Sequence, residues 1–279
     1  MKFLETIKSE ISKYNLFIYI FLIWNAFKLF FINSDPIIQV LNLLLSIGIY
    51  FCIEDKKLKI NNRRRLDFFI GIIGITFTLI RSFFLNNVDD KYYYFNLPIG
   101  IFFLIIILNP FKEFAYLKNI FLISLLLPFR RLFFELANFS LGSLIPSLTW
   151  FVLFSLGQNP ILDGQNITIK DHQFVLSKGC WGADNLYFVL ATLIIYSCIF
   201  RLRKIKNISI LIMFSTLISI VINVIRNNLL VFIISSNISN REDIFVFLHD
   251  SYGSLIFSFF SILIISFLYF NFLNKELNS

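Results

Sequence analysis

The sequence has 279 residues, of which 57% are hydrophobic and only 15% are charged. A soluble domain of this length needs polar and charged side chains over most of its surface, so the composition excludes a soluble globular protein. In a soluble protein the net charge of +8 would favour nucleic-acid binding. In a membrane protein it reflects basic loops on one side, and we expect no nucleic-acid partner.

Eight apolar segments approach or reach the length of a bilayer crossing, and polar connections separate them. Lipid offers no partner to backbone N–H and C=O groups, so each segment must be helical. The sequence therefore predicts an all-α membrane protein: a multi-pass bundle of about eight transmembrane helices, forming a single integral membrane domain over residues 1–279. The predicted spans are 16–33, 37–53, 68–85, 95–109, 119–137, 182–200, 208–233 and 252–271.

The polar connections differ sharply in basic charge. With eight alternating spans, 16 of the 25 Lys and Arg residues fall on one side, chiefly in the loops 54–65 and 201–207. Basic loops remain in the cytoplasm. We therefore expect both termini in the cytoplasm of a multi-pass plasma (inner) membrane protein, and residues 158–181 and 235–250 outside.

Residues 139–157 do not fit this alternation, because a further crossing would place the basic loop 201–207 outside. We expect a re-entrant or interfacial helix there. In the preceding span, Arg131 and Glu135 are spaced to pair on a helix. Arg130 and Arg131 either extend to the outer headgroups or face a substrate.

The stretch that follows alternates polar and apolar residues on both sides of Lys170-Asp171. QNITI (165–169) and HQFVLS (172–177) are typical of two short strands. They predict a short extracytoplasmic β-hairpin, lying over the bundle, that returns the chain to the membrane at Cys180.

Cys180 lies where this polar loop meets a long apolar segment. Cys52 and Cys198 lie near the cytoplasmic ends of their predicted helices, so a disulfide with Cys180 is not expected. At a helix start, the helix dipole favours the thiolate form of a cysteine. The alternative interpretation is that Cys180 serves only as a small hydrophobic side chain at the membrane boundary.

Arg226 lies inside an apolar run, where a guanidinium costs at least ~2.5 kcal/mol unless it faces partners or water. Asn223, Arg226 and Asn227 are spaced i, i+3 and i+4, so they form one polar stripe in the outer half of the predicted helix. The structural alternative is that Arg226 pairs with a carboxylate and fixes the register of the helix.

The chain has two histidines, His172 and His249, and the predicted orientation places both outside. Cys180, Arg226 and His249 thus come at the outer ends of successive helices. A thiolate that attacks a carbonyl, an imidazole that carries a proton and a guanidinium that stabilises an oxyanion together suit acyl transfer. Zinc binding by Cys180, His172 and His249 is the alternative, but the spacing is not compact, so we expect no metal and no other cofactor.

Three motifs follow one another in the chain: Cys180-Trp181-Gly182 at a helix start, Asn223-Val224-Ile225-Arg226 in the next helix, and His249-Asp250-Ser251-Tyr252-Gly253 before another. Together they resemble the motifs of the exosortase/archaeosortase family of membrane transpeptidases, over about residues 140–270. The family usually has a small residue where this chain has Trp181, and we expect the bulky ring to narrow the peptide groove.

The resemblance implies a membrane-embedded cysteine endopeptidase and transpeptidase with its active site outside. Such enzymes cleave exported proteins that carry a short C-terminal motif, a transmembrane helix and a basic end. They act through a thioester and pass the new carboxyl terminus to an envelope acceptor. The expected partners are therefore such exported proteins and membrane lipid.

We assign Cys180 as nucleophile, His249 as proton carrier, and Arg226 as oxyanion stabiliser or clamp for a substrate carboxylate. Supporting candidates are Asn223, from the shared motif, Asp184 or Asp250 as the group that orients the histidine, and His172 as the rival base. Two other classes of function remain: a small-anion transporter with its site at Arg226, and a non-catalytic assembly factor for surface polymers.

Overall fold

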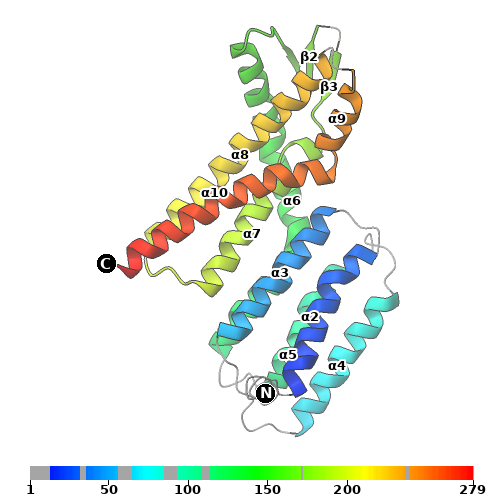
Figure 1. Ribbon diagram of the computed structural model, residues 1–279, viewed down its shortest axis with the longest axis vertical. Coiled ribbons are helices and arrows are strands. Elements are labelled where there is room, and N and C mark those ends of the chain that lie inside the picture. Colours follow the sequence, from blue (N-terminus) through cyan, green and yellow to red (C-terminus); the bar gives the residue numbers. More distant parts are fainter. Residues whose placement is uncertain are drawn as a thin grey trace, which may run out of the picture. The chain divides into compact units, whose positions relative to one another are not determined.

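The computed structural model describes residues 13–31, 36–55, 65–84, 93–108, 114–170, 172–236 and 239–278 (Figure 1). The described chain is mostly helical and divides into two compact units, Met1–Pro128 and Phe129–Ser279. The N-terminal segment 1–12 and most of the basic loop 54–65 carry the predicted orientation, and they lie outside the described residues.

The first unit contains helices whose small and polar residues allow close packing. Gly71 and Gly74 of α4 lie directly against Ile107 and Phe103 of α5, so a side chain at either glycine would collide with its neighbour. The Asn25 amide of α2 donates a 3.0 Å hydrogen bond to Asn42 of α3. The elements are α2 (Lys13–Phe31), α3 (Pro36–Asp55), α4 (Arg65–Phe84), η1 (Tyr93–Phe95), α5 (Asn96–Leu108) and the beginning of α6 (Phe114–Ser155).

The second unit is a helical bundle with a small sheet at one end (Figure 1). Helices α7, α8 and α10 pack against one another. Hydrogen bonds also link them: Asn185 of α7 donates to the Ser219 carbonyl of α8 at 3.2 Å, and the hydroxyls of Tyr196 and Ser266 lie 2.9 Å apart. After the sheet come η2 (Lys178–Cys180), α7 (Ala183–Ile199), α8 (Ile205–Ser235), α9 (Arg241–His249) and α10 (Ser251–Leu277).

The sheet has three antiparallel strands in the order β1 (Ile161–Asp163), β2 (Asn166–Ile169) and β3 (His172–Val175). Strands β2 and β3 occupy the residues of the predicted hairpin, and β1 is an additional strand. Ile167 is paired with Phe174, and both side chains pack with Leu153 and Val231 from the helices below. Burial of one face thus fixes the sheet on the bundle, next to the chain that leads to Cys180.

Where the structure describes them, the predicted spans coincide with helices apart from their end residues, and these helices differ in length. Residues 32–33, 85 and 109 of these spans lie outside the described part of the chain. Among the described residues, three helices are long and apolar enough to cross a membrane: Pro36–Ile53, Ile205–Ser235 and Tyr252–Leu277. Phe69–Phe84, Asn96–Ile107 and Ala183–Ile199 are shorter apolar helices. The spans 16–33 and 119–137 fall mainly in α2 and α6. The protein is a membrane protein with several apolar helices, and the count of eight crossings stays a prediction.

Residues 139–155 are not a separate helix but the C-terminal part of α6, which includes Pro128. Apolar helices tolerate an internal proline because neighbouring groups satisfy the freed carbonyl. The helix ends only where Gly157 adopts a φ of +74° and the Gln158 N–H donates to the Leu153 carbonyl at 3.1 Å. The predicted boundary between 137 and 139 was therefore wrong.

Candidate active site

Cys180 lies in the short connection between the sheet and α7. It ends the 3₁₀ turn η2, its N–H donates to the Ser177 carbonyl at 2.8 Å, and only 3% of it is exposed. Gly182 follows with a φ of +80°, a conformation that other residues rarely adopt, and turns the chain into α7. Cys180 thus lies just before the first turn of α7, and the predicted span 182–200 likewise begins after it.

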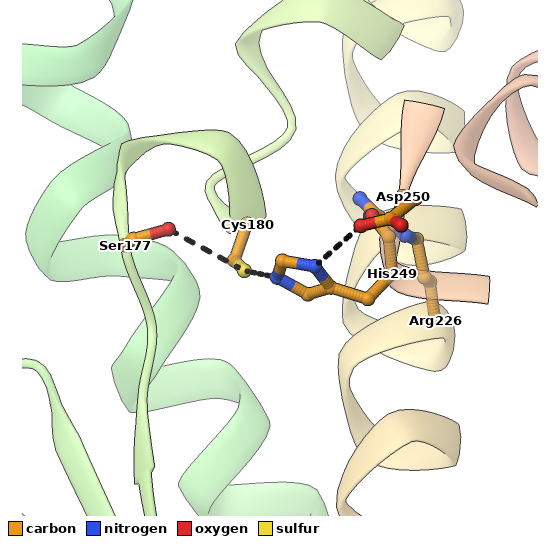
Figure 2. Close-up of polar contacts among 5 residues, drawn as sticks. All are labelled: Ser177, Cys180, Arg226, His249 and Asp250. Carbon is orange, nitrogen blue, oxygen red and sulfur yellow. Dashed lines mark hydrogen bonds and ion pairs between the residues drawn. The ribbon is translucent and has the colours of Figure 1, made fainter. Parts of the chain in front are cut away.

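His249 lies directly opposite the thiol, at the C-terminal end of α9 (Figure 2). Its Nε2 atom is 3.5 Å from the Sγ of Cys180. On the other side of the ring, Nδ1 is 3.6 Å from a carboxylate oxygen of Asp250. The Phe245 ring stacks on the imidazole, with 5.2 Å between centroids and 14° between planes. These contacts orient the imidazole toward the sulfur.

The environment favours an ion pair between these two groups. Burial raises the pKa of the Cys180 thiol, but the hydrogen bond with His249 and the positive charges of His249 and Arg226 outweigh it, so the net pKa is lowered. The same hydrogen bond to Cys180 raises the pKa of His249, against the effects of burial and of Arg226. The geometry therefore suits a thiolate beside an imidazolium, the reactive form of a cysteine nucleophile.

Arg226 approaches this pair from α8. Its Nη2 donates a 2.9 Å hydrogen bond to the main-chain carbonyl of His249, and the side chain is 4% exposed. Within the described residues Arg226 forms no salt bridge, and its Nε has no hydrogen-bond partner. The carboxylate of Asp184 is near enough to act on Arg226 electrostatically, and the Nε atom remains a buried donor that is available to a bound group.

The two acidic candidates lie in different places. Asp250 is beside His249, whereas Asp184 accepts hydrogen bonds of 3.1 and 2.6 Å from Nε and Nη2 of Arg130 on α6. Asp184 is therefore held by Arg130, and Asp250 is the carboxylate that contacts the imidazole. The expected pair of Arg131 and Glu135 is present at 3.8 Å, with both side chains exposed.

The polar stripe on α8 faces the cysteine turn. Asn223 and Asn227 each donate from Nδ2 to the main-chain carbonyl of Cys180, at 2.8 and 2.9 Å. Asn223 was a predicted supporting residue, whereas Asn227 was placed in the same polar stripe without a role in the proposed catalysis. Its spacing from Asn223 was the available signal, because residues four apart lie on the same face of a helix.

A cavity of about 280 Å³ opens beside the thiol. His172, the rival base, lines it from β3 together with His249, so the two histidines are near the same space. In the described part of the chain, no three His, Cys, Asp or Glu residues are grouped as metal ligands. The lining residues are His172, Gln173, Phe174, Val175, Leu176, Cys180, Asn227, Leu230, Val231, Ile234, Phe245 and His249.

Trp181 does not belong to the lining of this cavity as far as the described residues show. Its ring is 6% exposed, packs against Gly142 of α6, and donates from Nε1 to the Leu176 carbonyl at 2.7 Å. The expectation that Trp181 narrows a peptide groove was therefore wrong, because the ring fills the core behind the cysteine turn.

Comparison with known proteins identifies one matching family. The family model described as "Transmembrane exosortase (Exosortase_EpsH)" matches residues 32–266, a range that includes Cys180, Arg226 and His249. No curated protein and no solved structure matches the chain.

Proposed function

Because the chain belongs to the transmembrane exosortase family, we propose that it is a membrane-embedded cysteine endopeptidase and transpeptidase. Its substrates are exported proteins with a C-terminal sorting signal, which it cleaves on the outer face of the membrane. The observation that carries the proposal is the 3.5 Å contact between the Cys180 thiol and the His249 imidazole, next to a cavity.

Acylation begins when the Cys180 thiolate attacks the carbonyl carbon of the scissile peptide bond. The resulting oxyanion is stabilised by Arg226, whose buried Nε donor has no partner among the described residues. The tetrahedral intermediate collapses, the C–N bond breaks, and His249 transfers a proton from Nε2 to the leaving amine. The products are a thioester on Cys180 and a released C-terminal peptide.

Deacylation uses the same groups in reverse. His249, now neutral, accepts a proton from the incoming nucleophile as that nucleophile attacks the thioester carbonyl. Collapse of the second tetrahedral intermediate breaks the C–S bond and restores the thiolate beside the imidazolium. An acceptor group of the cell envelope gives transfer, and water gives hydrolysis. Asp250, 3.6 Å from Nδ1, supports the imidazole orientation in both steps.

Two features of the substrate signal suit the proposed enzyme: its transmembrane helix and its basic end. A C-terminal transmembrane helix of the substrate can dock laterally from lipid, and the cleavage motif next to it then enters the cavity beside Cys180. Phe174, Leu230 and Val231 give that cavity apolar walls. The basic end of the signal stays in the cytoplasm by the same rule that orients the enzyme.

The test is co-expression with an exported protein that carries such a C-terminal signal, followed by measurement of the intact mass of that protein. We expect loss of the C-terminal segment with the wild-type enzyme and with Cys198→Ala. Cys180→Ala should abolish cleavage, with a loss on the order of a thousandfold or more. Continued processing by Cys180→Ala would refute the thiol mechanism.

A second pair of variants separates the two histidines. We expect His249→Ala to lose cleavage and His172→Ala to retain it, because His249 is the histidine that contacts the sulfur among the described residues. The opposite pattern would assign the proton carrier to β3 instead of α9.

A further inference from the structure

One turn of α8 contacts the main chain of both members of the reactive pair. Asn223 and Asn227 donate to the carbonyl of Cys180, and between them Arg226 donates to the carbonyl of His249. The two carbonyls belong to residues 69 positions apart in sequence. The relative position of thiol and imidazole is therefore set by side chains at i, i+3 and i+4 of a single helix.

The carbonyl of Cys180 needs such partners. It ends a 3₁₀ turn, where the last carbonyls of a helix have no intrahelical donor. A carbonyl oxygen accepts two hydrogen bonds, and the two asparagine amides, which are 2% and 0% exposed, supply both. Holding this oxygen against α8 fixes the peptide group after Cys180 and, with it, the direction of the Cα–Cβ bond that carries the sulfur.

Asn227 differs from its sequence neighbour Asn228 in one informative respect. Both are buried, at 0% and 5% exposure, but the Asn228 amide donates to the Val224 carbonyl of its own helix, at 2.8 Å. Of these two neighbours, Asn227 bonds to the cysteine turn and lines the cavity beside the thiol, whereas Asn228 does neither among the described residues. Burial of an amide alone does not account for this placement.

We propose that Asn227 is a positioning residue of the active site, which, together with Asn223, holds the Cys180 main chain so that the sulfur meets His249. Its effect on catalysis rests on the proposed function, whereas its effect on the reactivity of the thiol does not. Loss of the Asn227 donor leaves Asn223 as the single amide on the carbonyl, and the turn gains freedom to move the sulfur away from the imidazole.

The test is the rate of alkylation of Cys180 by iodoacetamide as a function of pH, in the purified full-length protein in detergent. Mass spectrometry of the peptide that contains Cys180 separates this reaction from those of Cys52 and Cys198. For Asn227→Leu we expect a higher pH midpoint and a rate at neutral pH that is lower by about three- to tenfold, since less thiolate is present. Asn228→Leu, the matched control, should stay within about twofold of wild type.

Equal pH profiles for wild type and a folded Asn227→Leu would overturn the proposal. If the leucine variant does not fold, Asn227→Ser replaces it, with Asn228→Ser as its control, because serine is smaller and too short to reach the carbonyl. Failure of both Asn227 variants to fold, with both Asn228 variants folded, would make Asn227 a structural residue and also overturn the proposal.

Cleavage of the sorting signal gives an independent readout. We expect Asn227→Leu to lower kcat, because the sulfur is no longer held beside the imidazole. If the wild-type protein cleaves no such signal, the proposed function fails, but the alkylation profiles still decide the role of Asn227.

Discussion

Replacing Gly182 with alanine should disturb the cysteine turn at a single defined contact. A Cβ at this position would lie 2.5 Å from the Cγ and 2.7 Å from the Nδ2 of Asn223, the amide that holds the Cys180 carbonyl. The backbone also adopts a φ of +80°, which costs a non-glycine residue roughly 1–2 kcal/mol. Displacement of the packed asparagine adds about 1–3 kcal/mol.

Gly164→Ala is the matched control. Gly164 also has a positive φ, +59°, but nothing lies within 4 Å of the position where a Cβ would be placed. The conformational cost is therefore shared, and the difference between the two variants reports the collision with Asn223 alone. With about 2–4 °C per kcal/mol, Gly182→Ala should unfold roughly 2–12 °C below Gly164→Ala.

Two measurements in detergent check this prediction: the thermal unfolding midpoint and the rate of Cys180 alkylation by iodoacetamide. We expect Gly164→Ala to alkylate Cys180 like wild type, and Gly182→Ala to do so more slowly at neutral pH, because the turn that places the thiol beside His249 has moved. The reasoning would be refuted by equal unfolding midpoints for the two alanine variants together with unchanged alkylation in both.

Three further predictions concern the surroundings of the pair. The pH profile of kcat/KM should be bell-shaped, because the active form has a thiolate and an imidazolium. Cys180 loses its proton on the acid limb, which lies below the ordinary thiol pKa because the pKa of Cys180 is lowered. His249 loses its proton on the alkaline limb, which lies above the ordinary imidazole pKa because the pKa of His249 is raised. A single limb would contradict the ion pair. Asp184→Asn should lower the free energy of unfolding by roughly 1–3 kcal/mol, because it removes the negative charge that pairs with the mostly buried Arg130. Glu135→Gln, in an exposed pair, should cost less than about 0.5 kcal/mol. Equal midpoints of the two variants in thermal unfolding would contradict this. Trp181→Phe should lower the free energy of unfolding by about 1–2 kcal/mol in the same assay, because the Leu176 carbonyl loses its hydrogen-bond donor. This variant should still cleave the substrate.

The reactive residues could be recognised from sequence because each is of a type that is energetically unfavourable or uncommon at its position in the chain. A guanidinium in an apolar run, such as Arg226, needs a reason to be there. Cys180 and His249 follow polar stretches at the predicted membrane border, and the order of the three motifs resembled a known family. Those signals are local, and a single sequence displays them directly.

Other contacts depend on distances that sequence does not encode. Arg130 and Asp184 are 54 positions apart, so their pairing follows from how α6 and α7 pack, and no local spacing reveals it. The side to which the Trp181 ring turns is set by Gly142, which leaves room for it on α6. The predicted boundary at 138 was wrong because helix α6 continues to Ser155 and ends before Gly157, which has a positive φ.

The main-chain carbonyl oxygens of Cys180 and His249 both accept hydrogen bonds from side chains of α8. Replacing the side chain of Cys180 or His249 leaves these oxygens in place. The chemistry of the site can therefore be removed while its architecture is kept. A Cys180→Ser or His249→Gln protein would retain the turn, the cavity and the alignment of α9 against α8. Such inactive forms are suited to serve as baits, which hold an uncut substrate in the membrane long enough for it to be cross-linked and identified.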